Sequence, residues 1–509
     1  MRSDGLLPYE IVGEPGKSQM TGHAGLLPYI DLACVLGMLE AADEGIGICG
    51  SQGWMDRDHV LSLALVNLAG GECVEDIRLL ESDPGLCRVF REAEKYGLSR
   101  HERVELGVRF RKGRSRTFPS ATRLYEYLNA FHNPDEEEKR VEGKAFIPEK
   151  NEHLVGLGKV NERVIGEVQR HAPQTEATLD IDATLAETHK EEALYCYKGY
   201  KAYQPITTYW AETGLAVWSE FRDGNVPAGY DMLRVVKESR KTLPPGIKKI
   251  RSRMDTAGYQ HDVLRYYATG DGGKEEIIEF TVSCDMTQEF RKAAVKVPEK
   301  EWQALYREER GNPVATGQEW VEVVYVPNAI AFKLSDPEYR YIAIREPLRQ
   351  GILPGMDEAQ GQMDLGFATV VCQGKAYKIS GIVTNMEGDG AELIKWHHGR
   401  CGASEDMHAV MKTDLAGGTL PSGKFGANAG WWGMVLLAYN LHVAMRMLAL
   451  PGGLKKKRLK GIRFALIDVA GRVVERGRQL YVRISRGHPA LDWLIEMRRK
   501  IARLSVAYA

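Results

Sequence analysis

The chain has 509 residues, of which 44% are hydrophobic and 27% charged, and its formal net charge is −1. This length suggests two to four domains, and the composition is that of a soluble globular protein. The near-neutral charge, taken alone, argues against a nucleic-acid partner.

The average charge hides an asymmetry. Residues 451–509 hold 15 Lys and Arg against four acids, a balance of +11, which leaves −12 for the rest of the chain. A second basic run lies at 109–116. Local charge governs phosphate binding, although a solvated face and a charged terminus account for either run alone.

No secretory signal is found in the first twenty residues, and none of the eight cysteines forms a CxxC pair. Both features favour the cytoplasm, and the cysteines argue against a disulfide framework or a four-cysteine zinc site. The most apolar stretch, 431–450, is interrupted by Asn440, His442 and Arg446. We therefore expect a buried core helix there and no membrane span.

The elements in chain order predict an α/β protein that begins with helices. We expect a loose N-terminus over 1–20 and a helical domain over 21–132, where apolar residues recur at spacings of three and four. A charged linker, 133–174, follows, with two prolines in its first part, 133–152.

From 175 the patterns become those of strands. Residues 175–299 predict three successive strands, then helix, strand, helix and strand, which is the connectivity of an RNase H-like mixed-sheet core. Residues 300–384 predict a β-rich insertion, and 385–450 return to helices of the core. The basic C-terminal region, 451–509, completes the chain.

Two acids stand at the ends of predicted core strands. Asp182 ends the first strand and Asp255 ends the strand after the first crossover helix. Mg²⁺ prefers oxygen ligands, and two such ions can drive a phosphoryl displacement. Each aspartate alone is more often a turn or helix cap.

A third carboxylate is expected in the segment 396–415, where Glu405, His408 and Lys412 follow one another at i, i+3 and i+7. That spacing predicts one helical face. An ordinary surface helix would show the same stripe of Glu and Lys.

With these motifs the sequence resembles a DDE-type insertion-sequence transposase, of the branch with a β-rich insertion before the third acid. The resemblance rests on Asp182-Ala183-Thr184, on Arg253-Met254-Asp255, and on the Glu405-x6-Lys412 spacing preceded by Arg400. It covers about 21–485. Its signature has one residue fewer between the Arg and the Glu, and a Tyr where this chain has His397 or Trp396.

The resemblance implies cleavage of DNA at terminal inverted repeats and joining of the 3′-OH ends to target DNA. It implies that Asp182, Asp255 and Glu405 are catalytic and hold Mg²⁺ or Mn²⁺. Contacts to DNA are expected from the residues Arg400, Lys412, Trp396 and Arg253. The implied partners are double-stranded DNA and a second copy of the chain, a homodimer on DNA, and the implied place is the nucleoid.

Other interpretations of these residues remain open. A metal-dependent endonuclease without strand transfer would use the same acids, and a transposase-derived DNA-binding protein would need none of them. Zinc could be held by the ligand set His397, His398, Cys401 and His408, although the spacing fits no usual finger.

Asp180 is the last open point, because a strand repeats its side-chain direction every two residues and Asp180 therefore shares a face with Asp182. We assign the metal to Asp182, at the strand end beside small residues. Asp180 is expected to accept a hydrogen bond from a basic residue or a hydroxyl.

Overall fold

The structure is a computed structural model that describes residues 19–110, 113–141, 143–270, 277–327, 337–348, 368–477 and 479–506. The predicted loose N-terminus therefore lies outside the described residues, except at its last two positions. The described chain divides into two units, residues 1–138, 149–172 and 410–509 in unit 1, and residues 139–148 and 173–409 in unit 2.

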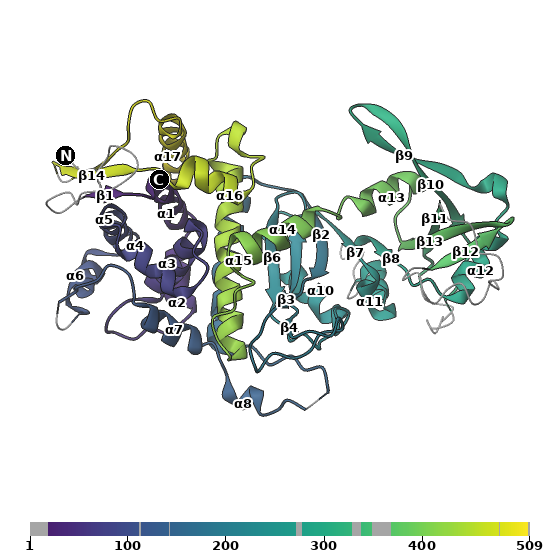
Figure 1. Cartoon of the computed structure of the whole chain (residues 1–509), viewed down its shortest axis with the longest axis horizontal. Helices are drawn as coiled ribbons and strands as arrows, with labels where there is room; N and C mark the ends of the chain where they lie inside the picture. Colours follow the sequence, from purple (N-terminus) through teal and green to yellow (C-terminus); the bar gives the residue numbers. More distant parts are fainter. Residues whose placement is uncertain are drawn as a thin grey trace, which may run out of the picture. The chain divides into compact units, whose positions relative to one another are not determined.

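Unit 1 is helical, with one small sheet (Figure 1). Its helices are α1 (Leu27–Val35), α2 (Met38–Gly45), α3 (Asp56–Ala69), α4 (Ile77–Glu81), α5 (Pro84–Ala93), α6 (Arg100–Val108), α7 (Ala121–Asn129), α8 (Pro134–Glu137), α9 (Glu152–His171), α15 (Phe425–Leu448), α16 (Leu459–Ile462) and α17 (Ala490–Val506). Its strands are β1 (Met20–Thr21), β14 (Gly471–Arg476) and β15 (Gln479–Arg483).

The centre of unit 1 is α15, which packs against α1, α3, α7 and α9. Nearly all of its side chains are buried, as expected for a core helix. Helix α9 passes α2 so closely that a Cβ on Gly156 would lie 2.0 Å from the carbonyl oxygen of Gly45. No single helix among the described residues is long and apolar enough to cross a membrane. The segments Ala24–Val35 and Met38–Gly45, which are bent by 58° relative to each other, reach the required length and apolar composition only when taken together.

Three predicted segments differ from the structure here. Residues 152–171, placed in the linker, form α9, and its N-cap is Asn151, whose side chain accepts a hydrogen bond from the Leu154 amide. The basic C-terminal region is a folded part of unit 1, because β14 pairs with β1 and α17 packs against α1. Of the segment 385–450 that we placed in the core, residues 410–450, which include α15, also belong to unit 1.

Unit 2 is a mixed α/β unit (Figure 1). Its strands are β2 (Glu176–Ala183), β3 (Ala186–Glu187), β4 (Ala202–Tyr203), β5 (Ile206–Trp210), β6 (Leu215–Glu220), β7 (Lys249–Met254), β8 (Glu279–Ser283), β9 (Gln303–Glu309), β10 (Asn312–Val323), β11 (Arg340–Pro347), β12 (Thr369–Cys372) and β13 (Lys375–Thr384). Its helices are α10 (Met232–Lys241), α11 (His261–Thr269), α12 (Gln288–Lys296), α13 (Gly390–His398) and α14 (Ala403–Ala409).

The large sheet of unit 2 has the order β6-β5-β2-β7-β8-β13-β11-β10-β9. Strands β2, β5 and β6 are antiparallel neighbours, whereas β7 and β8 run parallel to β2. This is the connectivity of an RNase H-like core, and it confirms the fold class expected from the sequence. The β-rich insertion extends the same sheet, since β13 pairs antiparallel with β8.

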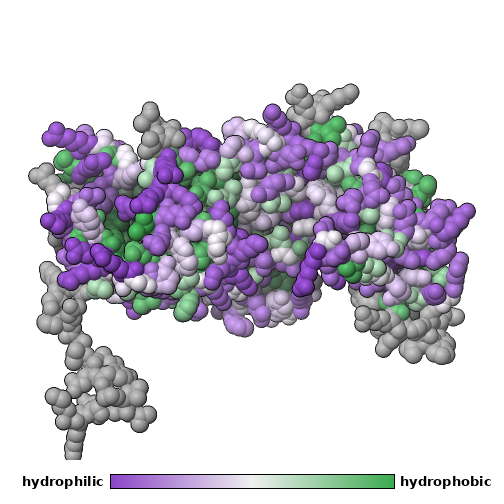
Figure 2. Space-filling view, turned by 90° about the horizontal axis from the view of Figure 1, so that it is seen from above, coloured by the Kyte–Doolittle hydropathy of each residue, from purple (hydrophilic) through white to green (hydrophobic). Residues whose placement is uncertain are grey.

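The face of the molecule that Figure 2 shows is mainly hydrophilic. In the space-filling view, polar residues cover most of the visible face and hydrophobic residues form scattered patches (Figure 2). All eight cysteines are free.

Candidate active site

Two aspartates stand side by side at the ends of parallel strands. The register of β2 and β7 pairs Ile181 with Met254, so the next residues along the two strands are Asp182 and Asp255. One oxygen of each carboxylate is held by the backbone: Asp182 accepts from the Ala183 amide at 3.0 Å, and Asp255 accepts from the Ala257 amide at 2.9 Å.

The third expected acid lies on α14, where Glu405 is exposed. The negative charge of Glu405 acts on Asp182 at the end of β2. Burial, the largest cause, and the negative charges of Asp255 and Glu405 together raise the pKa of Asp182 to about 6, against a lowering effect of Arg400. The three acids of unit 2 thus act on one another electrostatically.

Two adjacent carboxylates at the strand ends supply oxygen ligands of the kind that Mg²⁺ or Mn²⁺ prefers. A cation there would offset the repulsion by Asp255, which after burial is the second cause that raises the pKa of Asp182. Among the residues that the structure describes, no three His, Cys, Asp or Glu side chains lie close enough together to ligate one ion.

Arg253, which we expected to contact DNA, instead bonds to neighbouring parts of unit 2. It donates to both oxygens of Asp180 at 2.7 Å, from Nε and from Nη2, and its Nη1 donates to the Trp396 carbonyl oxygen at 2.7 Å. Its guanidinium also lies 5.2 Å from the centre of the Trp396 ring. Arg253 is only 6% exposed, so it holds β7 to β2 and α13, and little of its side chain reaches the surface.

The expectation for Asp180 is confirmed by the same pair, because its partner is a basic residue one strand away. Asp180 is 1% exposed, whereas the side chain of Asp182 is 22% exposed. Of the two aspartates that share a face, only Asp182 is open to a ligand.

Arg400 follows α13 and keeps an unused donor. Its Nε is buried without a hydrogen-bond partner among the described residues. Its positive charge counteracts the rise that burial causes in the pKa of both Asp180 and Asp182. A guanidinium in this place can bind a phosphate that enters the site.

His397, one of the possible zinc ligands, has both ring nitrogens engaged by hydroxyls. Nδ1 lies 2.8 Å from Thr281 Oγ1 and Nε2 lies 3.0 Å from Ser283 Oγ. Burial, followed by the charge of Arg400, lowers the pKa of His397 to about 3. The geometry is that of a histidine joining α13 to β8 and disfavours the zinc interpretation.

The helical face predicted through Glu405 and Lys412 is not continuous. Helix α14 ends at Ala409, and a π-helical turn, Val410–Asp414, follows it. The wider turn changes the phase of the side chains after Ala409, and such turns are frequent at functional sites.

His408 lies near Asp182, although the sequence suggested for it only a place in the possible zinc site. It is buried, and its Nδ1 lies 3.9 Å from Asp182 Oδ2. Its position three residues after Glu405, on the same predicted helical face, was the sequence feature that could have indicated a place near the acids.

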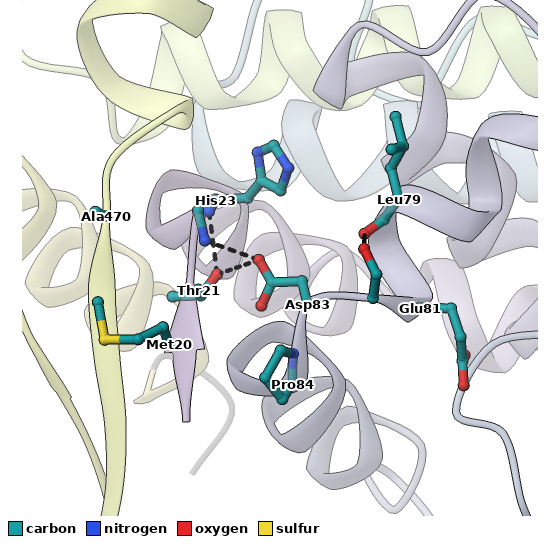
Figure 3. A pocket seen from close by; sticks show the side chains of 10 residues that line it. Met20, Thr21, His23, Leu79, Glu81, Asp83, Pro84 and Ala470 are labelled. Atoms are coloured by element: carbon teal, nitrogen blue, oxygen red, sulfur yellow. Dashed lines mark hydrogen bonds between the residues drawn. The ribbon is translucent and has the colours of Figure 1, made fainter. Parts of the chain in front are cut away.

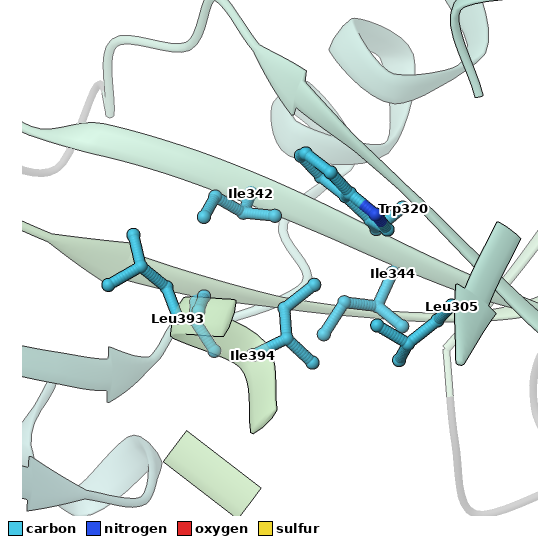
Figure 4. Packing of buried hydrophobic residues seen from close by; sticks show 7 residues of the cluster. Leu305, Trp320, Ile342, Ile344, Leu393 and Ile394 are labelled. Carbon is cyan, nitrogen blue, oxygen red and sulfur yellow. The ribbon is translucent and has the colours of Figure 1, made fainter. Parts of the chain in front are cut away.

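Helix α13, which leads to the third acid, rests on the β-rich insertion. Leu393 and Ile394 pack on the insertion residues Leu305, Trp320, Ile342 and Ile344 (Figure 4). The packing is close, because a Cβ on Gly390 would lie 2.2 Å from the Trp320 ring. The insertion therefore supports the helix that precedes Arg400 and Glu405.

A hollow of about 900 Å³ lies in unit 1, beside β1 and the start of α5 (Figure 3). Its acid, Asp83, accepts hydrogen bonds from Thr21 Oγ1 at 2.8 Å, from the Gly22 amide at 2.9 Å and from the Leu86 amide at 2.7 Å. The carboxylate thus caps α5 and fixes β1, and the hollow carries no catalytic constellation.

Comparison with known proteins gives one family. Residues 358–506 match the family model of the transposase DDE domain group 1. No curated protein matches the chain. Among solved structures, a piggyBac transposase in a synaptic complex with hairpin DNA is 10% identical, covering 94% of this chain and 80% of that one, with a TM-score of 0.39 that is too low to argue from. The matched segment contains Glu405, and the resemblance to DDE-type transposases is confirmed over residues 358–506 of this chain.

Proposed function

We propose that the chain is a transposase that cuts DNA at the ends of its element and joins the freed 3′-OH ends to target DNA. The observation that supports this best is the pair Asp182 and Asp255 at neighbouring strand ends of an RNase H-like sheet. Burial, then the charge of Asp255 and, more weakly, that of Glu405 on α14 raise the pKa of Asp182. The match of residues 358–506 to a transposase DDE domain supports it independently.

In this proposal Asp182, Asp255 and Glu405 hold Mg²⁺ or Mn²⁺. When bound, two such ions activate the attacking oxygen and stabilise the leaving oxygen of a phosphoryl transfer. Arg400 binds a phosphate oxygen with its spare donor and offsets the charge that develops at phosphorus. Arg253 keeps Asp180 neutralised beneath the site, so that no further charge repels the DNA.

The proposal assigns binding of the terminal inverted repeats to unit 1. Its exposed basic ridge, which we define as Lys455, Lys456, Lys457, Arg458 and Lys460, precedes and enters α16. The local charge suits phosphates despite the net charge of −1. Two ends must be brought together, so a homodimer on DNA is proposed, with the protein at the nucleoid in the cytoplasm.

The test is a cleavage and joining assay. Purified protein is incubated in Mg²⁺ with a labelled duplex that carries the repeat flanking its reading frame, and with a supercoiled target plasmid. A transposase gives nicked ends and labelled plasmid, whereas an endonuclease gives nicked ends only. Binding to the repeat without any cleavage would favour the transposase-derived DNA-binding protein.

A further inference from the structure

The chain between β2 and β5 forms a small projection at the edge of the sheet where Asp182 lies. Strand register sets Asp182 opposite Thr207 and Ala183 opposite Ile206, so the segment leaves and rejoins the sheet beside the acid. Within it, β3 and β4 pair antiparallel, with Ala186 opposite Tyr203 (Figure 1). We call residues 186–203 the tyrosine hairpin.

The base of the tyrosine hairpin is firmly held. Ala193, Cys196, Ala202 and Tyr203 are all at most 5% exposed. The Ala202 amide donates to the Leu194 carbonyl oxygen at 3.1 Å. These interactions give the tip a rigid support.

The tip presents aromatic rings to solvent. Tyr195 is 65% exposed and Tyr197 is 77% exposed. The chain turns between them and Lys201, where the Cys196 amide donates to the Tyr200 carbonyl oxygen at 2.9 Å, and Gly199 adopts a φ of 83°. A buried Cys196 between two exposed tyrosines fixes the direction of both rings.

Each exposed ring has a lysine beside it. Lys198 Nζ lies 5.7 Å from the centre of the Tyr197 ring, and Lys201 Nζ lies 6.0 Å from that of Tyr195. The two rings therefore have two cations beside them, and Lys201 Nζ also donates to the Glu191 carbonyl oxygen at 2.6 Å. Glu191 and Glu192 lie on the outgoing limb.

Exposed rings interleaved with cations are suited to single-stranded nucleic acid. A base stacks on a tyrosine only when its face is free, and stacked duplex bases hide their faces. The lysines can meet the phosphates that flank a stacked base. The projection begins and ends beside Asp182, so its rings belong to the segment that flanks the acid.

We propose that Tyr195 and Tyr197 form a stacking platform for unpaired bases of the DNA strand next to the scissile phosphate, an inference that rests on the proposed function. Lys198 and Lys201 bind the backbone of the same strand. The platform selects DNA whose end is frayed or single-stranded over fully paired DNA.

The test compares the full-length protein with the double variant Tyr195→Ala, Tyr197→Ala. The probes are a short oligothymidine, a fully paired duplex, and a duplex with an overhang that contains 2-aminopurine. We expect the double variant to bind the oligothymidine about tenfold more weakly, to bind the duplex within about twofold of the wild type, and to lose the quenching of 2-aminopurine.

Two controls separate stacking from folding and from general charge. The pair Tyr195→Phe, Tyr197→Phe keeps the rings and is expected to bind like the wild type. Tyr306→Ala removes a tyrosine of β9 that is 47% exposed and should change nothing. Equal losses on oligothymidine and duplex, or unchanged binding of the oligothymidine, would overturn the platform.

Failure of the platform and failure of the proposed function give different results. If the wild type cuts and joins DNA but the double variant quenches 2-aminopurine normally, the platform is wrong and the function stands. If the wild type neither cuts nor joins but the alanine pair abolishes quenching, the function is wrong and the platform stands.

Discussion

Asp180 and Arg253 form a buried two-pronged ion pair between neighbouring parallel strands, with both N–O distances 2.7 Å. They are partners in the register of β2 and β7. Further along the same two strands, just past the pair Ile181 and Met254, stand the two aspartates of the candidate site. A structural pair and a candidate catalytic pair thus lie close together on the same two strands.

The first prediction separates these two pairs by mutation. Asp180→Asn leaves the Arg253 charge buried without its counter-ion and is expected to cost about 3–5 kcal/mol of unfolding free energy. Asp182→Asn removes a carboxylate whose pKa is raised to about 6, so it should not destabilise unit 2 at pH 7, while cleavage falls below detection.

Both variants can be compared with the wild type by urea unfolding and by nicking of a labelled duplex in Mg²⁺. Equal stability losses in the two variants would contradict the distinction. An active Asp182→Asn protein would show that the metal is held elsewhere.

The second prediction concerns the metal. Cleavage should require Mg²⁺ or Mn²⁺ and persist in a zinc-selective chelator, because the site offers carboxylate oxygens and His397 is engaged by Thr281 and Ser283. Activity is measured after removal of all divalent ions and after separate return of each ion. Restoration by zinc alone would favour the histidine and cysteine set.

The third prediction is a pH dependence of stability that is due to His397. Burial lowers its folded-state pKa to about 3 from an ordinary 6.5. Above pH 6.5 the residue is neutral in both states. As the pH falls below 6.5 only the unfolded chain takes up the proton, so His397 should account for a loss of about 2 kcal/mol between pH 6.5 and 5.

His397→Gln tests this effect, since an amide can still bond to Thr281 or Ser283. The variant should be less stable at pH 7.5, yet its unfolding free energy should fall less steeply below pH 6.5. Parallel curves for wild type and variant would contradict a neutral buried histidine.

The fourth prediction concerns the basic ridge. Replacing Lys455, Lys456 and Lys457 by alanine should weaken DNA binding and flatten the plot of log affinity against log salt by about 0.9 for each phosphate that the variant no longer neutralises. The matched control replaces the same three lysines by arginine, which keeps the charge. A slope that does not change in the alanine variant would remove the ridge from the DNA interface.

Deletion of the whole basic C-terminal region does not serve this purpose. Residues 451–509 supply β14, which pairs with β1, and α17, which packs against α1. Their removal would open unit 1, and weak DNA binding would then report unfolding.

The sheet could be predicted from the sequence because its strands carry strong local patterns. Three short β patterns, of which the second and third are joined by a tight turn, and then strands separated by amphipathic helices, leave few possible connectivities. The strand-end positions of Asp182 and Asp255 followed directly, since each strand pattern stops at the acid.

Long-range partners could not be predicted. The role of Arg253 depends on which strand lies beside it, and nothing local distinguishes a buried Arg from one that meets DNA. Residues 152–171 were assigned to a linker because the charged and proline-containing stretch before them masked the start of α9. The return of 451–509 to unit 1 depends on β14 finding β1, which lies near the opposite end of the sequence.

The pairing of β14 with β1 affects the order in which the two units can fold during synthesis. Unit 2 is finished once residue 409 has been made, whereas unit 1 still lacks α15, α17 and the strands that hold β1. The large sheet and α14, which carries Glu405, can therefore fold on the ribosome. The helices that precede the sheet can complete their packing only after the C-terminal residues have been made. A premature stop after residue 409 would yield a chain with an intact acid-bearing sheet and an incomplete helical unit.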